Sequence, residues 1–284
     1  MDLIQVWGDL PMMTSTAFVL CTNMVHTIKI TNLLRRKQRI EKIVRSNNKV
    51  LQQATGVEER KLLQKCNRGT TCHLFIFLTL TSVTLVGLAV GAVLDSEDKQ
   101  LLFRAWYPFD WRKSPAYEIT YFHQIFAIYL AACLNVSKDI LVVSLIAQCR
   151  CRLRLLAHAL KTLCHGMKTV WRFPKTLDVL IQHRLRDCTR EHQRILTAVN
   201  EIQNCFSAPT FAQFSVSLVI ICVTAFQMTS QTGNLVRMLS MATYLLNMME
   251  QVFIYCYEGS ELLVEMLKVS YSFFTVLRQV DEES

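Results

Sequence analysis

The side chains that could do chemistry in this sequence are a few charged and amide groups placed inside long apolar stretches. Glu250 lies within one such stretch, and Arg278 and Gln279 lie near the end of the last one. A charge surrounded by lipid is costly, so it normally faces a water-filled cavity, a helix partner or, by snorkelling, the headgroups. These residues therefore predict ion pairs or a polar path between helices.

The sequence carries no recognisable motif of an enzyme, a cofactor or a metal site. It contains no HExxH, no glycine-rich phosphate loop and no GxSxG. Cys188 and His192 are four residues apart on an expected helix, but two ligands do not make a zinc site. We therefore expect no enzyme activity, no cofactor and no bound metal. The 11 cysteines scatter through apolar stretches and basic loops, which favours thiols over a disulfide framework.

The elements that must position these groups are long apolar helices. Cys72 to Leu94 is a run of 23 residues without a formal charge, and Phe206 to Leu235 is a run of 30. A bilayer core is about 30 Å thick and takes roughly 20 apolar residues as a helix. We therefore predict an all-α fold, a polytopic transmembrane helix bundle with cytosolic helical extensions, in one domain over residues 1–284. The candidate spans are 12–34, 72–94, 119–147, 206–228, 236–257 and 262–280.

The loops between these spans differ sharply in charge. The segment 35–71 holds 11 Lys and Arg against 3 acidic residues, and 148–204 holds 11 against 4. The segment 95–118, which contains "RAWYPFDWRKSPAY", holds 4 against 5. Because positive loops stay in the cytosol, both basic loops are predicted inside and the aromatic loop outside. Counting spans forward from there puts the C-terminus outside, and the formal charge of +9 reflects topology rather than nucleic-acid binding.

The second basic loop also reads as an amphipathic helix. Apolar or weakly polar residues recur every three to four positions from Leu177 to Ile202. Such a stripe needs a partner, which is either another subunit or the cytosolic extensions of the chain's own spans; the alternative is a solvated helix on the headgroups.

Aromatic and methionine side chains on two spans are candidates for a small-molecule pocket. Phe122, Phe126 and Tyr129 share one helix face at spacings of four and three, and Met241 and Tyr244 lie on a later span. Apolar, aromatic and Met-rich surfaces suit small lipophilic ligands, although such stripes also pack or face lipid. The aromatic loop before the third span is predicted to anchor at the membrane interface, or to close over an outer pocket.

Three motifs of the sequence resemble those of insect odorant receptors: "RAWYPFDW" before a span, "YCYEGSEL" after the fifth span, and the terminal "LKVSYSFFTVLRQV". The resemblance runs over essentially the whole chain. The resemblance implies an odorant-gated cation channel of the plasma membrane that opens on binding a small volatile. It further implies hetero-tetramers with a shared co-receptor subunit and olfactory signal transduction. Members have seven spans, the N-terminus inside and the C-terminus extracellular.

The resemblance also assigns residues to the ion path. The last span would line the pore, with Val276 as a hydrophobic gate and Gln279 as a polar ring, and an apolar gate blocks ions by dewetting. The ligand would bind between the outer halves of the second to sixth family spans, a region that the candidates Phe122, Phe126, Tyr129, Met241 and Tyr244 match approximately. We also weighed a gustatory receptor-type channel, a non-functional truncated receptor and a G-protein-coupled receptor.

The sequence departs from the family pattern at two places. Members are longer, and the chain starts near their second span, so that their first span is expected to be absent. "YCYEGSE" also runs almost directly into "LLVEMLKVSYSFF", so only a few residues are left to turn the chain between the fifth and sixth spans. We expect a tight turn there, crowded by Glu258, Glu261 and Glu265.

Overall fold

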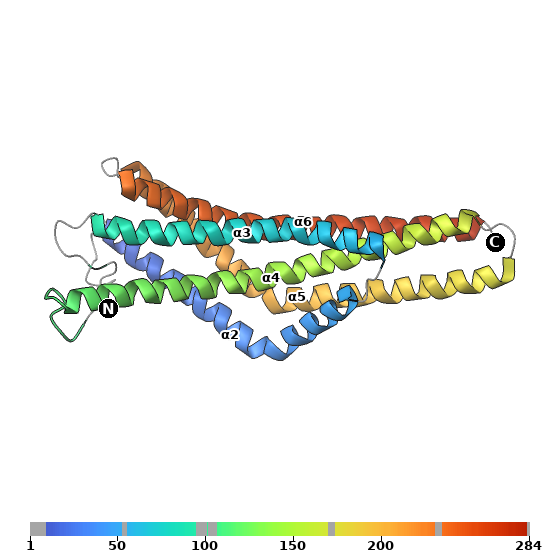
Figure 1. Ribbon diagram of the computed structural model, residues 1–284, viewed down its shortest axis with the longest axis horizontal. Helices are drawn as coiled ribbons and strands as arrows, with labels where there is room; N and C mark the ends of the chain where they lie inside the picture. Colours follow the sequence, from blue (N-terminus) through green and yellow to red (C-terminus); the bar gives the residue numbers. More distant parts are fainter. Residues whose placement is uncertain are drawn as a thin grey trace. The chain divides into compact units, whose positions relative to one another are not determined.

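The structure is a computed structural model that describes residues 10–52, 56–94, 101, 107–169, 174–230 and 235–282. These residues form five helices (Figure 1): α2 (Leu10–Gln52), α3 (Val57–Leu94), α4 (Ala116–Thr169), α5 (Pro174–Ser230) and α6 (Leu235–Glu282). No strand occurs in the described part of the chain, and the predicted all-helical fold class is confirmed.

Local signals in the sequence account for where two of the helices begin. The backbone N–H of Gly56 donates to Glu59 Oε2 at 3.1 Å, which is half of a capping box at the start of α3. Glu58 and Glu59 both lie in the first turn, where negative charge complements the helix dipole. Helix α5 begins with Pro174, whose missing N–H costs nothing at a first helical position.

Each helix contributes to two compact units, which we describe separately. Unit 1 comprises Met1–Thr31, His73–Ile140 and Pro209–Phe253. Unit 2 comprises Asn32–Cys72, Leu141–Ala208 and Ile254–Ser284. Unit 2 therefore contains nearly all of both basic loops, together with the C-terminal half of α6.

Unit 1 has a polar interior and an apolar surface. Phe75, Phe122 and Phe211 are each at least 70% exposed. The buried polar side chains are Lys29, Thr84, Thr120, Gln124, Asp139, Gln213, Ser217, Thr224, Asn247 and Gln251. Soluble proteins show the reverse arrangement, whereas a protein in lipid can expose apolar side chains and must satisfy its polar groups internally. Unit 1 thus has the surface of a membrane-embedded helix bundle.

Hydroxyl side chains on α3 illustrate how this bundle satisfies its polar groups. Thr79, Thr81 and Thr84 each donate to the backbone carbonyl four residues earlier, at 2.8 Å in every case. This local hydrogen bond removes an unpaired hydroxyl without needing water. A serine- and threonine-containing helix can therefore lie in lipid at little cost.

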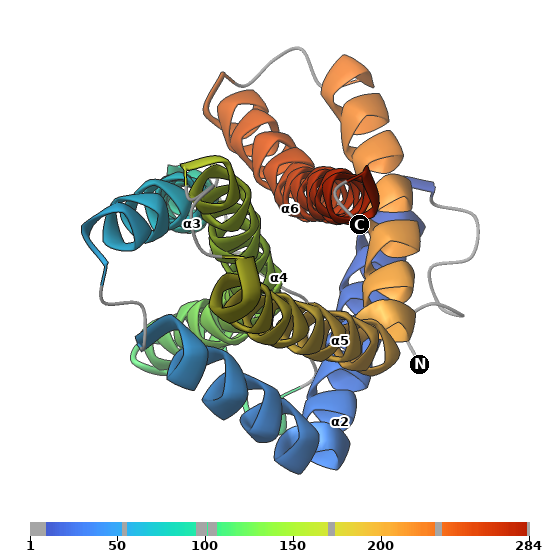
Figure 2. The same ribbon diagram turned by 90° about the vertical axis from the view of Figure 1, so that its right-hand side faces the viewer.

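Unit 2 differs from unit 1 in having an apolar core cluster and many exposed charges, although it also buries charged side chains such as Arg150 and Glu258. Its core cluster consists of Leu153, Leu156, Leu160, Leu163, Ile195, Val269 and Val276, which come from α4, α5 and α6. Arg45, Lys61 and Arg194 have side chains at least 67% exposed. Figure 2 shows α4 lying among α3, α5 and α6. Leu185, Cys188 and Val199 of the predicted amphipathic stripe pack against the cluster, so the stripe finds a partner within its own chain.

Helix α6 corrects one expectation from the sequence. It runs without interruption from Leu235 to Glu282, so the turn expected between the spans 236–257 and 262–280 is wrong. Within the described residues, three helical stretches are long and apolar enough to cross a membrane: Val57–Gly87, Ala116–Leu163 and Gln182–Thr229. They contain most or all of the predicted spans 72–94, 119–147 and 206–228. The spans 12–34, 236–257 and 262–280 stay predictions.

A proline inside α5 is accommodated by a side chain from α2. Pro209 has no N–H, so the carbonyl of Cys205, four residues earlier, loses its usual helical donor. Asn32 Nδ2 donates to that carbonyl at 2.8 Å, and Arg36 Nη1 donates to the neighbouring carbonyl of Asn204. Both carbonyls stay paired, and α5 continues through the proline.

Helices α3 and α6 approach each other closely within unit 1. A Cβ atom at Gly87 would lie 3.1 Å from Ser240 Oγ. Small residues allow helix backbones to approach in this way in membranes, where packing drives association.

Candidate functional site

An ion pair lies in the interior of unit 1. Lys29 Nζ of α2 is 2.7 Å from Asp139 Oδ1 of α4, and the two side chains are only 7% and 2% exposed. Lys29 also donates to Asn135 Oδ1 at 3.1 Å. A buried pair of this kind is stable only where hydrogen bonds satisfy the remaining polar atoms. Lys29 lies within the predicted span 12–34 and Asp139 within the predicted span 119–147.

Two glutamines continue a hydrogen-bond network from this ion pair. Gln251 Nε2 of α6 donates to Asp139 Oδ2. Gln213 Nε2 of α5 donates to Gln251 Oε1 at 2.9 Å and is 3.0 Å from Ser217 Oγ. We call Lys29, Asp139, Gln213, Ser217 and Gln251 the polar lock. It joins α2, α4, α5 and α6 through buried side chains.

Helix α3 joins the same bundle by separate contacts with α6. Thr81 Oγ1 donates to Asn247 Oδ1 at 3.0 Å. His73 Nδ1 is 3.4 Å from Glu250 Oε1, and the His73 ring lies 5.8 Å from that of Phe253. Glu250 therefore has the helix partner that its position predicted.

The five residues predicted for a ligand pocket divide into two groups. Phe122, Phe126 and Tyr129 are 70%, 52% and 53% exposed and lie on an outward face of α4. The rings of Phe122 and Phe126 stack with centroids 6.4 Å apart. Met241 and Tyr244 of α6 are half-buried. Met241 and Tyr244 are thus more enclosed by the protein than the three α4 residues, and a small-molecule site requires enclosure.

The aromatic loop is fastened to the start of α4. Gln124 Nε2 donates to the Tyr107 hydroxyl at 3.1 Å, and the rings of Tyr107 and Phe109 lie 5.4 Å apart. The Tyr121 hydroxyl donates to the carbonyl of Ala89 on α3 at 2.9 Å. Trp106 lies outside the described residues. The loop is thus held against α4, which is itself joined to α3.

Val276 lies in a different setting from the one that the resemblance assigns. Its side chain is fully buried, and it belongs to the core cluster of unit 2 with Leu160, Ile195 and Val269. The side chain of Gln279 lies outside the described part of the chain. The gate and polar-ring assignments stay predictions.

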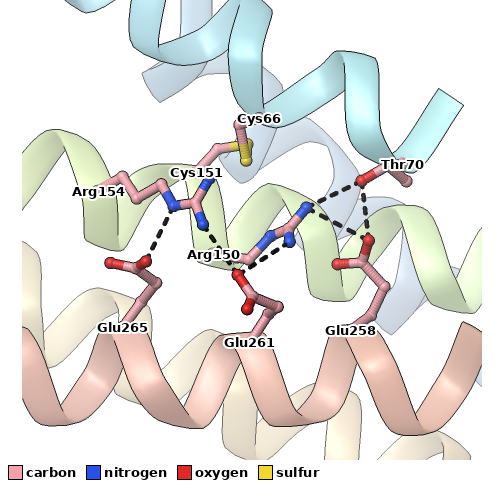
Figure 3. The surroundings of a disulfide bond; sticks show 8 residues. All are labelled: Cys66, Thr70, Arg150, Cys151, Arg154, Glu258, Glu261 and Glu265. Carbon is pink, nitrogen blue, oxygen red and sulfur yellow. Dashed lines mark hydrogen bonds and ion pairs between the residues drawn. A yellow bond between two sulfur atoms is a disulfide. The ribbon is translucent and has the colours of Figure 1, made fainter. Parts of the chain in front are cut away.

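Acidic residues on α6 pair with arginines on α4 in unit 2 (Figure 3). Arg154 is 2.9 Å from Glu261 and 3.1 Å from Glu265. Arg150 is 3.3 Å from Glu258 and 3.5 Å from Glu261. The acids are spaced three and four apart along one helix face, and the arginines four apart along another. We call these five residues the charge ladder. Its three glutamates are the residues that the sequence had placed in a crowded turn.

A disulfide lies beside the charge ladder. Cys66 of α3 and Cys151 of α4 are bonded, with Cα atoms 6.1 Å apart. Thr70, one turn after Cys66, donates to Glu258 Oε1 at 2.9 Å and accepts from Arg150 Nη2 at 3.1 Å. The expectation that the cysteines are thiols is wrong for this pair.

Helices α2 and α5 also attach to α4 through an arginine. Arg152 Nη2 is 2.6 Å from Glu191 Oε1, and Arg152 Nη1 donates to Asn47 Oδ1 at 2.6 Å. Asn47 Nδ2 in turn lies 3.9 Å from Cys149 Sγ. Periodicity had indicated that these helices need partners, but not which side chains would meet.

Comparison with solved structures identifies the fold. The insect olfactory receptor OR5 from Machilis hrabei is similar with a TM-score of 0.76 and 15% identity, over 95% of this chain and 68% of that one. The same receptor in complex with eugenol gives a TM-score of 0.71 and 17% identity, over 92% of this chain and 65% of that one. The five described helices therefore adopt the helical fold of that receptor.

Sequence comparison points the same way. Odorant receptor Or1 of Anopheles gambiae is 26% identical over 272 residues, which is 89% of this chain and 65% of the relative. Odorant receptor 82a of Drosophila melanogaster is 22% identical over 279 residues, or 92% and 69%. The chain thus spans about two thirds of the length of these relatives. The family profile described as 7tm Odorant receptor matches residues 10–276. Because that match takes in most of the sequence, this membrane protein belongs to the odorant receptor family.

Proposed function

We propose that this chain is an odorant receptor subunit of the plasma membrane, part of a cation channel opened by a small volatile. The observation that carries the proposal is the family match over residues 10–276. The fold shared with a receptor whose structure was solved with eugenol supports a small-molecule ligand. The family resemblance further suggests that the subunit works in olfactory signal transduction within a hetero-tetramer that contains a co-receptor.

We place the proposed ligand-binding site in unit 1. Of the predicted pocket residues, Met241 and Tyr244 suit direct contact, because they are half-buried on α6 and a bound ligand must be largely enclosed. Phe122, Phe126 and Tyr129 are proposed as a flanking outward face, where they meet lipid or a ligand approaching from lipid. Methionine adapts its shape to several ligands, which suits a receptor for varied volatiles.

Ligand binding would act by shifting a population. A volatile opens the channel only if it binds the open arrangement of helices better than the closed one. The ligand residues on α6 lie on the same helix as Gln251, which donates into the polar lock. A change in how α6 packs within unit 1 would therefore alter the hydrogen bonds at Asp139 and Gln213. The lock is the proposed element with two discrete arrangements.

Current recordings test the proposal. The chain is expressed with a co-receptor, and currents are recorded during a panel of volatiles. Tyr244→Ala is expected to raise the half-maximal concentration about tenfold, which corresponds to roughly 1.4 kcal/mol of lost contact. The matched control is Leu246→Ala, on the same helix with a side chain 53% exposed, which should leave the response unchanged. Full surface expression without any evoked current would contradict the channel proposal.

A further inference from the structure

We propose that residues 254–282 are not a membrane span but a helix docked on the cytosolic side, in the same compartment as the two basic loops. The proposal rests on the membrane location of unit 1 and deepens the proposed function, because it decides which part of this subunit is available to line an ion path. It differs from the topology that counting six separate spans predicts.

The continuity of α6 is the first argument. A chain that crosses a bilayer and crosses back must turn between the two spans. Residues 235–282 form one helix of 48 residues, which is about 72 Å long at 1.5 Å per residue. The apolar core of a bilayer is only about 30 Å thick. If 236–257 crosses the membrane, the helix carries 262–282 out of it on the far side.

The charge ladder is the second argument. Glu258 and Glu265 are 0% and 4% exposed, and they pair with Arg150 and Arg154 of α4. Those arginines belong to the segment 148–204, whose charge predicts a cytosolic location. Carboxylates are expensive in lipid unless they are paired. The partners that compensate them here come from a basic segment, which fixes 258–265 beside it.

The apolar side of the same helix supplies the third argument. Val269 and Val276 are both fully buried against Leu160 and Ile195, in a cluster that takes in the amphipathic stripe of the second basic loop. A segment that crossed the bilayer alone would take these two side chains out of the cluster that covers the stripe. The C-terminal half of α6 is thus, together with α4, a partner of the stripe.

The opposite face of this segment is apolar and exposed, which is the feature that a membrane span at 262–280 would have. Leu263, Leu267, Tyr271 and Phe274 are 58–69% exposed, at spacings of four and three. Insertion of that face into lipid is what a membrane span at 262–280 would provide. The two locations put the end of the chain on opposite sides of the membrane, so topology mapping separates them.

Topology mapping uses the full chain translated with microsomes, where a cassette is glycosylated only on the lumenal side. One cassette follows Ser284, one follows Val170 in the second basic loop, and one follows Asp98 in the aromatic loop. The expected result is that the cassettes after Ser284 and Val170 stay unmodified while the one after Asp98 is glycosylated. A modified tail cassette, or the same state at all three positions, would overturn the proposal. Glycosylation is measured without any odorant, so the topology proposal can hold even if no odorant response is found.

Charge exchange provides a second measurement on detergent-solubilised protein. Arg154→Glu and Glu265→Arg should each lower the thermal midpoint, and the double exchange should recover part of the loss because the pair is re-formed. The matched control is the exchange of Arg45 and Glu41, whose side chains are 82% and 48% exposed and 3.4 Å apart; it should leave the thermal midpoint unchanged. If Arg154 and Glu265 behave independently, the docked helix is refuted.

Discussion

The buried ion pair of the polar lock gives the sharpest prediction. Asp139→Asn keeps the size of the side chain but removes the charge that neutralises Lys29, which is 7% exposed. Breaking a buried pair from one side typically costs about 3–5 kcal/mol, because the remaining charge is left uncompensated. For a chain of this size that corresponds to a thermal midpoint lower by about 10 °C. Gln251 also loses the carboxylate oxygen to which it donates.

Fluorescence-detected size exclusion after heating measures this shift in detergent-solubilised protein. Replacing both partners, by Lys29→Met with Asp139→Leu, should bring the midpoint closer to wild type than Asp139→Asn does, since no buried charge then remains. If Asp139→Asn melts at the wild-type temperature, or the double variant is worse than either single one, the ion pair does not stabilise unit 1.

Three further predictions concern single contacts. Asn32→Leu should cost about 1–3 kcal/mol by orphaning a buried carbonyl, and much less in a Pro209→Ala background that restores the helical donor; equal costs in both backgrounds would contradict the capping role. Cys66→Ser should release one additional thiol to maleimide in unreduced, denatured protein, because Cys151 loses its partner; one thiol fewer than wild type would show that no disulfide forms. Phe77→Ala should destabilise by about 3–5 kcal/mol because the ring is 2% exposed, whereas Phe75→Ala, at 70% exposed, should shift the thermal midpoint little.

The fold class could be predicted from the sequence because lipid imposes a strong rule on composition. Runs such as Cys72 to Leu94 are long enough to span and carry no formal charge, and lipid leaves the backbone few alternatives to a helix. The helical nature of the second basic loop was equally visible from its periodicity. Both signals are local, so one sequence suffices to detect them.

The partners inside each unit could not be predicted in this way. Lys29 and Asp139 are 110 residues apart, and nothing in the spacing along either helix says that they meet. Cys66 and Cys151 are separated by 85 residues, so their bond was equally invisible. The turn at Glu258 was wrongly expected because 236–257 and 262–280 were read as two separate spans, whereas they belong to one helix. Arginines from another helix compensate the carboxylates of the charge ladder, which lets α6 continue.

The contact between Gly87 and Ser240 bears on how such a receptor could change its preferences. A methyl group at position 87 would lie 3.1 Å from the serine hydroxyl oxygen, so Gly87→Ala must push α3 and α6 apart or rotate the serine. Met241 follows Ser240 directly, and Tyr244 lies one turn beyond. The distance between α3 and α6 beside these two side chains thus depends on a residue with no side chain of its own. For the ligand site proposed at Met241 and Tyr244, a change at Gly87 would therefore act through helix spacing, with both proposed contact residues unchanged.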